Sequence, residues 1–341
     1  MRGPVNIGLL GLGSIGATHA KALAELRQLA TVRAFSGGNG ERAAESGWPE
    51  AVQKGPEELV ADAETDLVAI CSPSEHHARH AIAALEAGKH IVVEKPLALT
   101  VSDADQIVRL AERKNRMAAV ISQRRFEPEY AAVKEMLQNG ALGHVRLAQT
   151  HVHWWRDADY YRAAPWRSSM VAGGGSLMNQ GVHNVDLLQW LVGPVIEVTA
   201  QYATLGHDIE AEDTTVATLR FTSGALGQIS TSTATPPGSP ATVVLHTDTG
   251  VIELGQGQIL RWDVEGTPPP RTTSDEATGA ADPAAIGIRG HVAQWKDVLN
   301  ALSAGSPPAI PAAQGASVVR LICGIYRAAE TGRSIQLEEL S

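Results

Sequence analysis

Three glycines near the start of the chain have the spacing of a phosphate-binding turn. Gly11, Gly13 and Gly16 follow an apolar run over residues 5–10 and precede residues 17–29, whose apolar positions recur with helical periodicity. In such a turn the first glycine bends the chain, the second lets a pyrophosphate approach, and the third lets helix and strand pack closely. The predicted dinucleotide contacts are Gly11, Gly13, Ser14, Ile15 and Gly16. A plain strand-to-helix turn is the alternative interpretation.

The end of the second predicted strand, residues 31–35, bears on the choice of cofactor. A dinucleotide fold that binds NAD normally has an acidic residue about 20 residues after the glycine motif, where it accepts the ribose 2′-OH. This chain has Ser36 and two glycines there, with Arg42 close downstream. Without a carboxylate to repel a 2′-phosphate, NADP is the favoured cofactor. NAD, held by weaker contacts, is the alternative.

A lysine follows a later predicted strand at the point where a cofactor should lie. Residues 66–70 and 90–93 are predicted strands, and they lead into Ser72 and Lys95 respectively. Ligands bind outside the carboxyl ends of parallel strands, so both residues should lie near the cofactor. A partly desolvated lysine can have a lowered pKa and exchange a proton with a substrate hydroxyl. The alternative is a solvated surface lysine. We also expect a cis peptide bond before Pro96, since the cis penalty at proline is only about 0.5–1 kcal/mol.

Polar residues on a later predicted helix form a second candidate centre. Asn179, His183 and Asp186 have the spacing i, i+4 and i+7, which places them on one helical face. Glycines 173–175 precede this helix, and Ser176 is its predicted N-cap. His183 titrates near neutrality and therefore suits general acid or base catalysis. A solvated helix face is the alternative.

Two histidines four residues apart, His76 and His80, have the spacing of a metal-binding pair on a predicted helix over residues 74–87. No third ligand is evident nearby, so we predict no metal site and instead a cofactor contact at the start of that helix.

Alternating strand and helix patterns up to residue 122 predict a Rossmann domain, and a strand-rich pattern follows. Strands are predicted over 144–154, 196–205, 214–222, 226–233, 241–247 and 250–254, and an exposed loop over 268–282. The predicted fold is α/β: a Rossmann domain (1–122) and a C-terminal α/β domain (123–341) with a large, mostly antiparallel open sheet. The C-terminal helices could pack back on the first domain. Helices would cover one face of the open sheet, leaving the other for a homodimer or homotetramer contact.

The bulk composition excludes several classes of function. With 28 Lys and Arg against 37 Asp and Glu, the formal net charge of -9 argues against a nucleic-acid binder. Two cysteines support neither a disulfide framework nor a thiolate metal site, and they favour a reducing cytoplasm. The sequence has no evident secretory signal and no apolar run of membrane-spanning length.

Taken together, these motifs resemble the Gfo/Idh/MocA oxidoreductases over essentially the full chain. The matching stretches are GLGSIGATHA (11–20), Ser72 and Pro73 with His77, AGKHIVVEKPLALT (87–100), GGGSLMNQGVHNVD (173–186), and the C-terminal helices from His291 to about Thr331. The resemblance implies a Rossmann domain with an open-sheet domain, tightly held NAD or NADP, and reversible oxidation of a sugar or cyclitol secondary alcohol.

The resemblance also implies roles for individual residues. Lys95 is similar to the family's essential lysine and His183 to its catalytic histidine, while Asn179 occupies a position where many members have aspartate and some branches use asparagine. Ser36, in place of the usual acidic residue, is similar to what the NADP-preferring branch of the family has. Further implied cofactor contacts are Arg42, Ser72, Pro73, His77, Glu94, Gln123, Trp166 and Arg167. Candidate substrate contacts, chosen mainly by position, are Arg125, His153, Trp155, Arg156, Tyr160, Tyr161 and Asp186. An aromatic cluster packed in the core is the alternative for the last group.

We therefore expect an NAD(P)-dependent oxidoreductase that moves a hydride between the cofactor and a secondary alcohol or ketone of a sugar, cyclitol or glycoside. Lys95 and His183 should meet around one substrate hydroxyl in a cleft that the two domains close. One alternative is a family member that uses the redox step to cleave a glycosidic bond. Another is a catalytically silent cofactor-binding sensor, although a sensor has no need of both Lys95 and His183.

Overall fold

The computed structural model describes residues 3–270 and 287–340 of the 341-residue chain. Internal contacts divide the chain into two compact units: residues 1–123 with 288–319, and residues 124–287 with 320–341. Each unit therefore combines an earlier and a later part of the sequence. The loop predicted over 268–282 lies mostly outside the described residues. Within the described part of the chain, every helix is too short or too polar to cross a lipid bilayer.

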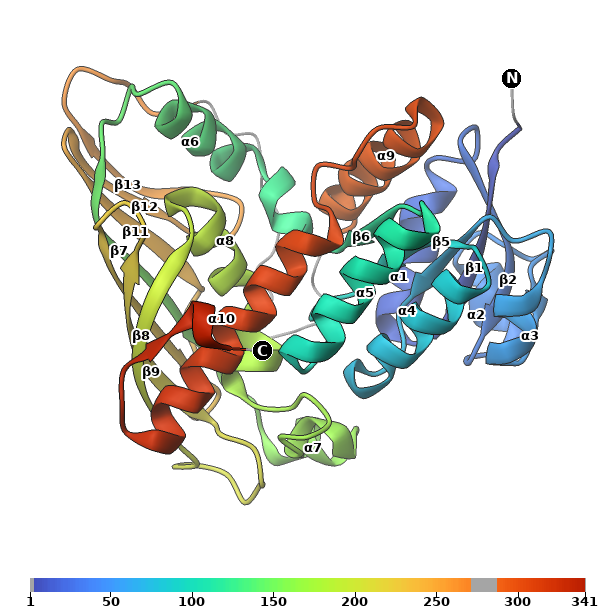
Figure 1. The fold of residues 1–341 in the computed structure, drawn as a ribbon, viewed down its shortest axis with the longest axis horizontal. Helices are drawn as coiled ribbons and strands as arrows, with labels where there is room; N and C mark the ends of the chain where they lie inside the picture. The colour runs from blue at the N-terminus through green and yellow to red at the C-terminus, as the bar shows by residue number, and fades with distance from the viewer. Residues whose placement is uncertain (1–2, 271–286, 341) are drawn as a thin grey trace. The chain divides into compact units, whose positions relative to one another are not determined.

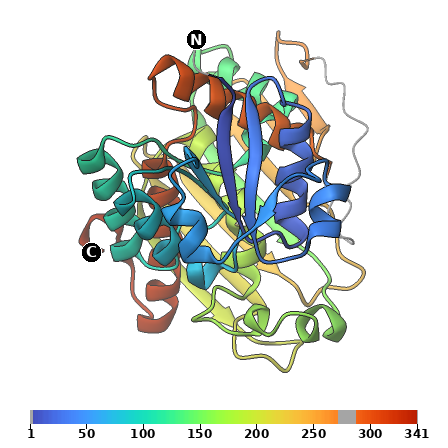
Figure 2. The ribbon, with the colours of Figure 1, turned by 90° about the vertical axis from the view of Figure 1, so that its right-hand side faces the viewer.

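Six parallel strands form the sheet of the first unit (Figure 2). They are β1 (Val5–Leu10), β2 (Ala30–Ser36), β3 (Val52–Gln53), β4 (Leu67–Ile70), β5 (His90–Val93) and β6 (Ala118–Val120). Their spatial order is β3-β2-β1-β4-β5-β6, so the chain reverses direction across the sheet between β1 and β4. In this doubly wound arrangement ligands bind outside the carboxyl ends of the strands near the reversal. The predicted Rossmann sheet is confirmed.

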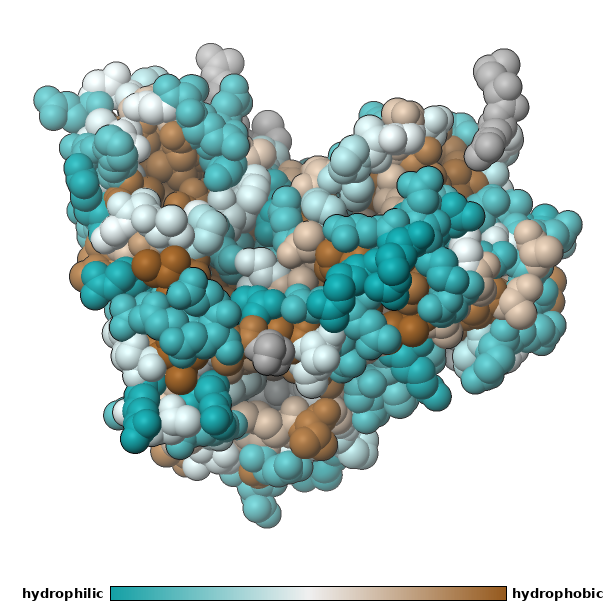
Figure 3. Space-filling model, in the orientation of Figure 1, coloured by the Kyte–Doolittle hydropathy of each residue, from teal (hydrophilic) through white to brown (hydrophobic). Residues whose placement is uncertain are grey.

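Helices of the first unit pack beside this sheet. They are α1 (Ser14–Ala24), α2 (Gly40–Glu45), α3 (Pro56–Ala61), α4 (His77–Glu86), α5 (Val101–Lys114) and α9 (Arg289–Ala304). The helix predicted to begin at Ser74 instead opens with a 3₁₀ turn, Ser74–His76, and α4 follows it. Thr100 caps α5 by accepting a hydrogen bond from the Asp103 amide at 3.1 Å. The exposed side of α5 is hydrophilic (Figure 3).

The core of the first unit joins the sheet to α1 and α9. Ile7 and Leu9 of β1, Leu23 of α1 and Trp295 of α9 belong to one cluster of buried apolar residues. Trp295 is fully buried, and α9 contacts α1. Burying a large apolar side chain contributes roughly 1.5–3 kcal/mol to the free energy of unfolding, so this packing stabilises the contact between α9 and α1.

Eight strands form the sheet of the second unit (Figure 1). They are β7 (Val145–His153), β8 (Val195–Ala203), β9 (Thr214–Phe221), β10 (Leu226–Ser232), β11 (Thr242–Thr247), β12 (Gly250–Leu254), β13 (Ile259–Val264) and β14 (Ile335–Gln336), in the order β13-β12-β11-β7-β10-β9-β8-β14. Within the described part of this sheet, the β7–β10 pair is parallel and the other pairs are antiparallel. The predicted mostly antiparallel sheet is therefore confirmed, and it contains the hairpins β9–β10 and β11–β12.

The sheet of the second unit has a buried face and an open face. On β9, Thr215, Ala217, Leu219 and Phe221 are buried, whereas the residues between them are at least partly exposed. Helix α8 (Val182–Val192) packs against β7 and β11. The remaining helices of the unit are α6 (Pro128–Gln138), α7 (Ala158–Arg162) and the later part of α10 (Ala312–Thr331).

Candidate active site

The glycine turn after β1 has the geometry that a dinucleotide needs. Gly11 has a φ of 102°, a conformation that favours glycine, and a Cβ at Gly16 would lie 2.0 Å from the carbonyl oxygen of Gly11. At Gly13 a Cβ would meet nothing within 4 Å, and no side chain caps the N-terminus of α1 there. The backbone of Gly13 is therefore open to a ligand, and the N–H groups of the first turn, which include Ser14 and Ile15, suit a pyrophosphate.

The turn after β2 packs directly on the glycine turn. The carbonyl oxygen of Ser36 accepts hydrogen bonds from the amides of Gly11 (2.8 Å) and Leu12 (3.0 Å). A Cβ at Gly38 would lie 2.4 Å from the Leu12 carbonyl oxygen, and the Arg42 guanidinium donates to the same oxygen at 3.4 Å. Arg42 is exposed and therefore able to meet a phosphate.

His77 joins the ends of β4 and β5. Its Nδ1 lies 2.6 Å from the carbonyl oxygen of Pro96 and its Nε2 lies 2.9 Å from that of Ser72. The ring is buried, and burial lowers the pKa of His77 although both carbonyl contacts oppose the change. A neutral imidazole has a single N–H, so His77 donates a hydrogen bond to one of these two turns and lies against the other. Pro73 precedes the 3₁₀ turn that leads into α4. The neighbouring His80 contacts the Ser72 hydroxyl through Nδ1 at 3.0 Å, and burial lowers the pKa of His80 to about 4.

Lys95 follows β5 directly, and its peptide bond with Pro96 is cis, as predicted. Burial lowers the pKa of Lys95, while the charge of Glu94 opposes this shift. Gln123 begins a 3₁₀ turn, Gln123–Phe126, beyond the last strand of the same sheet. Its side-chain oxygen is buried without a hydrogen-bond partner among the described residues. Lys95 and Gln123 thus both lie beyond the carboxyl ends of sheet strands.

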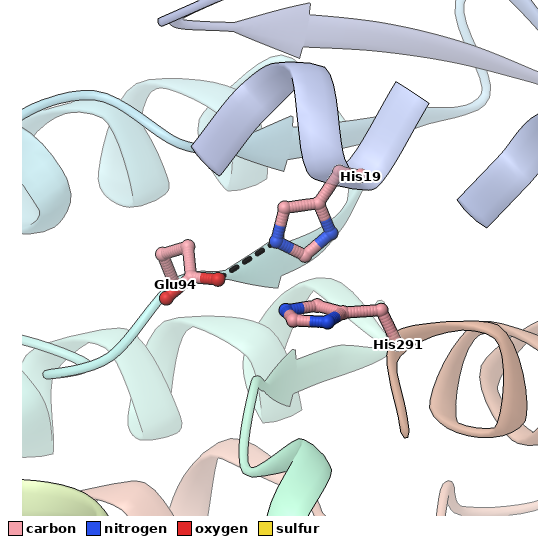
Figure 4. A group of neighbouring side chains, drawn as sticks. All are labelled: His19, Glu94 and His291. Carbon is pink, nitrogen blue, oxygen red and sulfur yellow. Dashed lines mark hydrogen bonds and ion pairs between the residues drawn. The ribbon is translucent and has the colours of Figure 1, made fainter. Parts of the chain in front are cut away.

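One group of side chains among the described residues has the composition of a metal site: His19, Glu94 and His291, all buried (Figure 4). His19 Nε2 lies 2.7 Å from Glu94 Oε1, and His19 Nδ1 lies 2.8 Å from Trp295 Nε1. An indole nitrogen can only donate a hydrogen bond, so His19 Nδ1 is the acceptor and the ring proton lies on Nε2. A protonated nitrogen cannot ligate a metal, which argues against a cation in this cluster.

The predicted helix of the second unit begins differently from expectation. Residues Ser176–Gly181 form a π-helix, and α8 starts only at Val182. Ser176 is not a helix N-cap, because its hydroxyl donates to Glu212 at 2.5 Å. Glu212 also accepts hydrogen bonds from the Leu177 amide and the Tyr326 hydroxyl, both at 2.9 Å. This buried carboxylate thus replaces the predicted cap and anchors the start of the π-helix.

Tyr160 lies beside the π-helix. Its hydroxyl accepts hydrogen bonds from the side-chain amides of Asn179 (3.3 Å) and Gln180 (2.5 Å). The guanidinium groups of Arg167 and Arg156 lie 4.1 and 5.3 Å from the centre of its ring. The second unit therefore brings Asn179 together with Tyr160, Arg156 and Arg167, and His183 follows half-buried on α8.

Asn179, His183 and Asp186 do not form the single α-helical stripe that their spacing predicts, because Asn179 belongs to the π-helix. Asp186 is buried and pairs with Arg125, whose Nη2 and Nε lie 2.5 and 2.7 Å from the two carboxylate oxygens. These two candidate substrate contacts therefore neutralise each other's charge.

The other candidate substrate contacts are divided between two places. His153 accompanies Ser230, 2.7 Å away, in the wall of a cavity of about 310 Å³ on the second unit's sheet. Trp155 and Tyr161 both contact the ring of His207, at centroid distances of 5.7 and 4.9 Å. Trp166, in the turn after α7, is half-buried. The roles of these residues remain predictions.

Three side chains whose contacts are described above are absent from the sequence predictions. Glu212 and Trp295 act on partners 36 and 276 positions away, so no local motif marks them. Gln180 adjoins a predicted residue, and its polarity within an apolar helix was the available signal.

Comparison with known proteins agrees with these features. Residues 5–122 match the family described as "Oxidoreductase family, NAD-binding Rossmann fold", and residues 130–253 match "GFO/IDH/MocA C-terminal domain". The chain is 26% identical to myo-inositol 2-dehydrogenase of Thermotoga maritima over 98% of this chain and 99% of that protein. It is 25% identical to scyllo-inositol 2-dehydrogenase (NADP(+)) IolW of Bacillus subtilis, over 83% and 82% of the two chains.

A solved structure extends the likeness to the full fold. The crystal structure of the WlbA dehydrogenase from Bordetella pertussis in complex with NADH and UDP-GlcNAcA superposes with a TM-score of 0.87, at 31% identity over 98% of each chain. The chain therefore belongs to the Gfo/Idh/MocA family of NAD(P)-dependent oxidoreductases, with an N-terminal Rossmann domain that binds the cofactor.

Proposed function

We propose that this protein moves a hydride between a nicotinamide cofactor and a secondary alcohol or ketone of a sugar, cyclitol or glycoside. The observation that carries the proposal is the position of Lys95. It follows β5, while the open glycine turn follows β1, and both strands run in the same direction in one sheet. Relatives named as inositol dehydrogenases, and one solved with a nucleotide sugar, support a carbohydrate-like substrate.

The residues present fit a dinucleotide. Gly13 leaves its backbone uncovered at the uncapped start of α1, so the amides of that turn would hold the pyrophosphate. When bound, the nicotinamide ring supplies the acceptor or donor of the hydride. The protein's own task is then to orient the substrate hydroxyl and to move its proton.

Lys95 and His183 are the proposed proton-transfer residues. Burial lowers the pKa of the half-buried Lys95 side chain, which brings the amine closer to the range where a lysine can both give and take a proton. His183 would share the same substrate hydroxyl, with a hydrogen-bond reach of about 2.6–3.2 Å for each group. Asn179 and Tyr160 would orient the substrate from the second unit.

NADP is the proposed preferred cofactor, because the β2 turn offers Ser36 and an exposed Arg42 where an acidic residue would repel a 2′-phosphate. We expect Arg42→Ala to weaken NADP binding by about 1 kcal/mol or more, as loss of a charge-assisted hydrogen bond does, and to leave NAD binding unchanged. Fluorescence titration with each cofactor measures both affinities. A preference for NAD that Arg42→Ala does not alter would contradict this assignment.

A turnover screen tests the proposed reaction. Purified protein is incubated with cyclitols, hexoses, glycosides and nucleotide sugars and with NAD⁺ or NADP⁺, and both reduced cofactor and products are measured. A ketone formed with stoichiometric reduced cofactor supports the proposal. Release of an aglycone without net reduction would indicate the redox-assisted cleavage of a glycosidic bond. Cofactor binding without turnover of any compound would indicate a sensor.

The open face of the eight-stranded sheet is the proposed subunit contact. Leu147 of β7 and Leu226 of β10 are exposed and lie side by side in register on that sheet. Light scattering of Leu226→Glu against the unchanged protein tests this contact, and an unchanged mass would contradict it.

A further inference from the structure

The carboxylate of Glu94 is bound on both sides within the first unit. Oε1 accepts the hydrogen bond from His19 Nε2, and Oε2 accepts one from the backbone amide of Lys95 at 2.9 Å. His19 lies on α1, the helix that follows the glycine turn, and Trp295 of α9 fixes its tautomer. A continuous chain of hydrogen bonds therefore runs from α9 through α1 to the backbone of Lys95.

Every side chain in this hydrogen-bond chain is shielded from water. Trp295, His19 and Glu94 are 0%, 1% and 5% exposed. Burial by itself would raise the pKa of Glu94, but the hydrogen bond that His19 donates and the positive charge of Lys95 outweigh it, so the pKa of Glu94 lies below its usual range. The site therefore contains a buried negative charge next to Lys95.

We propose that Glu94 is a positioning residue for Lys95, held in place by the Trp295–His19 pair, and that its charge stabilises the Lys95 ammonium. The proposal rests on the proposed function, in which Lys95 carries the hydroxyl proton. Glu94 acts through the backbone amide, which fixes where the lysine begins, and through its charge. It is not assigned a contact with substrate.

Lys95 is the positively charged partner of Glu94, because the other ionisable groups around this carboxylate are uncharged or have a lowered pKa. Besides Lys95 they are His19 of α1, His291 of α9, Cys71 after β4 and His77 of α4. Burial raises the pKa of Cys71 and lowers that of His291 to about 4, so both are uncharged near neutral pH. Burial also lowers the pKa of His77. His19 is neutral, because its Nδ1 accepts from Trp295.

This arrangement ties Lys95 to the cofactor-binding helix. His19 lies on the buried side of α1 with Gly16 and Leu23, six residues after Gly13. Displacing α1 would therefore move the carboxylate that holds the Lys95 amide. The same hydrogen bonds thus connect the helix that follows the pyrophosphate turn with the backbone of Lys95.

Competitive chemical labelling of amines tests the inference on the full chain without requiring substrate. The rate of acetylation of Lys95, followed by mass spectrometry over a range of pH, reports its pKa directly. In Glu94→Gln, which keeps the side-chain shape, we expect the pKa of Lys95 to fall by about one unit or more, since the charge of Glu94 raises this pKa and burial lowers it. Trp295→Phe should produce a smaller fall in the same direction.

Trp48→Phe is the matched control. Trp48 is a buried tryptophan whose Nε1 donates to the Ala20 carbonyl oxygen of α1 at 2.8 Å, so the change removes one indole hydrogen bond to the same helix but leaves His19 untouched. It should leave the labelling profile of Lys95 unchanged. An equal effect in Trp48→Phe and Trp295→Phe, or no effect in a folded Glu94→Gln protein, would overturn the proposal.

Nitrogen-15 NMR of the histidine rings gives a test that does not depend on the folding of any variant. We expect His19 of the unaltered protein to carry its proton on Nε2 alone, and a proton on Nδ1 would overturn the inference. Added Zn²⁺ should not raise the melting temperature, whereas a rise that His291→Ala abolishes would assign a metal site instead. If the labelling result holds but the turnover screen fails, the proposed function fails and the positioning role stands.

Discussion

Asn179 is uncharged and stands four residues before His183 in the sequence. Its amide donates to the Tyr160 hydroxyl, so the asparagine holds a defined orientation. In Asn179→Asp the new carboxylate stabilises the protonated ring, and we expect the pH limb that His183 contributes to kcat/KM to move up by about one unit. The pH dependence of kcat/KM measures the shift, and Asn179→Ala, which adds no charge, should not produce it. Equal profiles for both variants would contradict the assignment of His183.

His291 makes stability depend on pH in a definite direction. Its pKa falls from 6.5 to about 4 in the folded protein, chiefly because the ring is buried. As the pH falls, the His291 ring therefore takes up its proton in the unfolded chain before it does so in the folded protein. The free energy of unfolding that His291 contributes above pH 6.5 is lost as the pH falls towards 4. The linked free energy is roughly 3 kcal/mol.

Because neither ring nitrogen of His291 has a hydrogen-bond partner among the described residues, His291→Phe should fold. Urea unfolding at pH 7 and pH 4 should show that the variant loses about 3 kcal/mol less than the unaltered protein over this interval. His19→Phe, by contrast, should be strongly destabilising at pH 7, because it leaves Glu94 and Trp295 without their buried partner. Parallel acid limbs for His291→Phe and the unaltered protein would refute this reading.

At the scale of elements, two glycines of one turn have separable tasks. A Cβ at Gly16 would overlap the Gly11 carbonyl oxygen, so Gly16→Ala should lower the free energy of unfolding by about 1–3 kcal/mol. A Cβ at Gly13 meets no protein atom, so Gly13→Ala should fold normally and lose cofactor affinity by about tenfold or more (1.4 kcal/mol). Denaturant unfolding and cofactor titration of both variants separate the two effects. Unaltered affinity in Gly13→Ala would remove the pyrophosphate from this turn.

Elements with strong local patterns were predictable, and those set by distant partners were not. The strand over 90–93 and the strand over 250–254 have the predicted bounds, because apolar runs and flanking turn residues define them. The two-residue strands β3 and β14 depend on an edge of an existing sheet and have no pattern of their own. The π-helix at Ser176 was also unpredictable, since its first residues are anchored by Glu212 from another segment.

Across the whole molecule, the candidate site residues that a local motif places were predictable, and the contacts that depend on distant partners were not. Gly11, Gly16 and Lys95 could be found from motif and spacing because strand and turn chemistry places them. The pairing of Arg125 with Asp186 could not, because it joins residues 61 positions apart. Nor could the hydrogen bonds of Glu94, which depend on α9 returning to pack against α1.

We propose that Lys95 of the first unit and His183 of the second take part in one reaction with a bound nicotinamide cofactor. The most direct test of this proposal measures kcat and cofactor Kd together for Lys95→Met and His183→Ala on the best substrate from the turnover screen. We predict that kcat falls by about 10²–10⁴-fold in each variant, as loss of a general acid or base requires, while the cofactor Kd stays nearly unchanged. Turnover of Lys95→Met at the rate of the unaltered protein, with the cofactor bound equally well, would contradict the account.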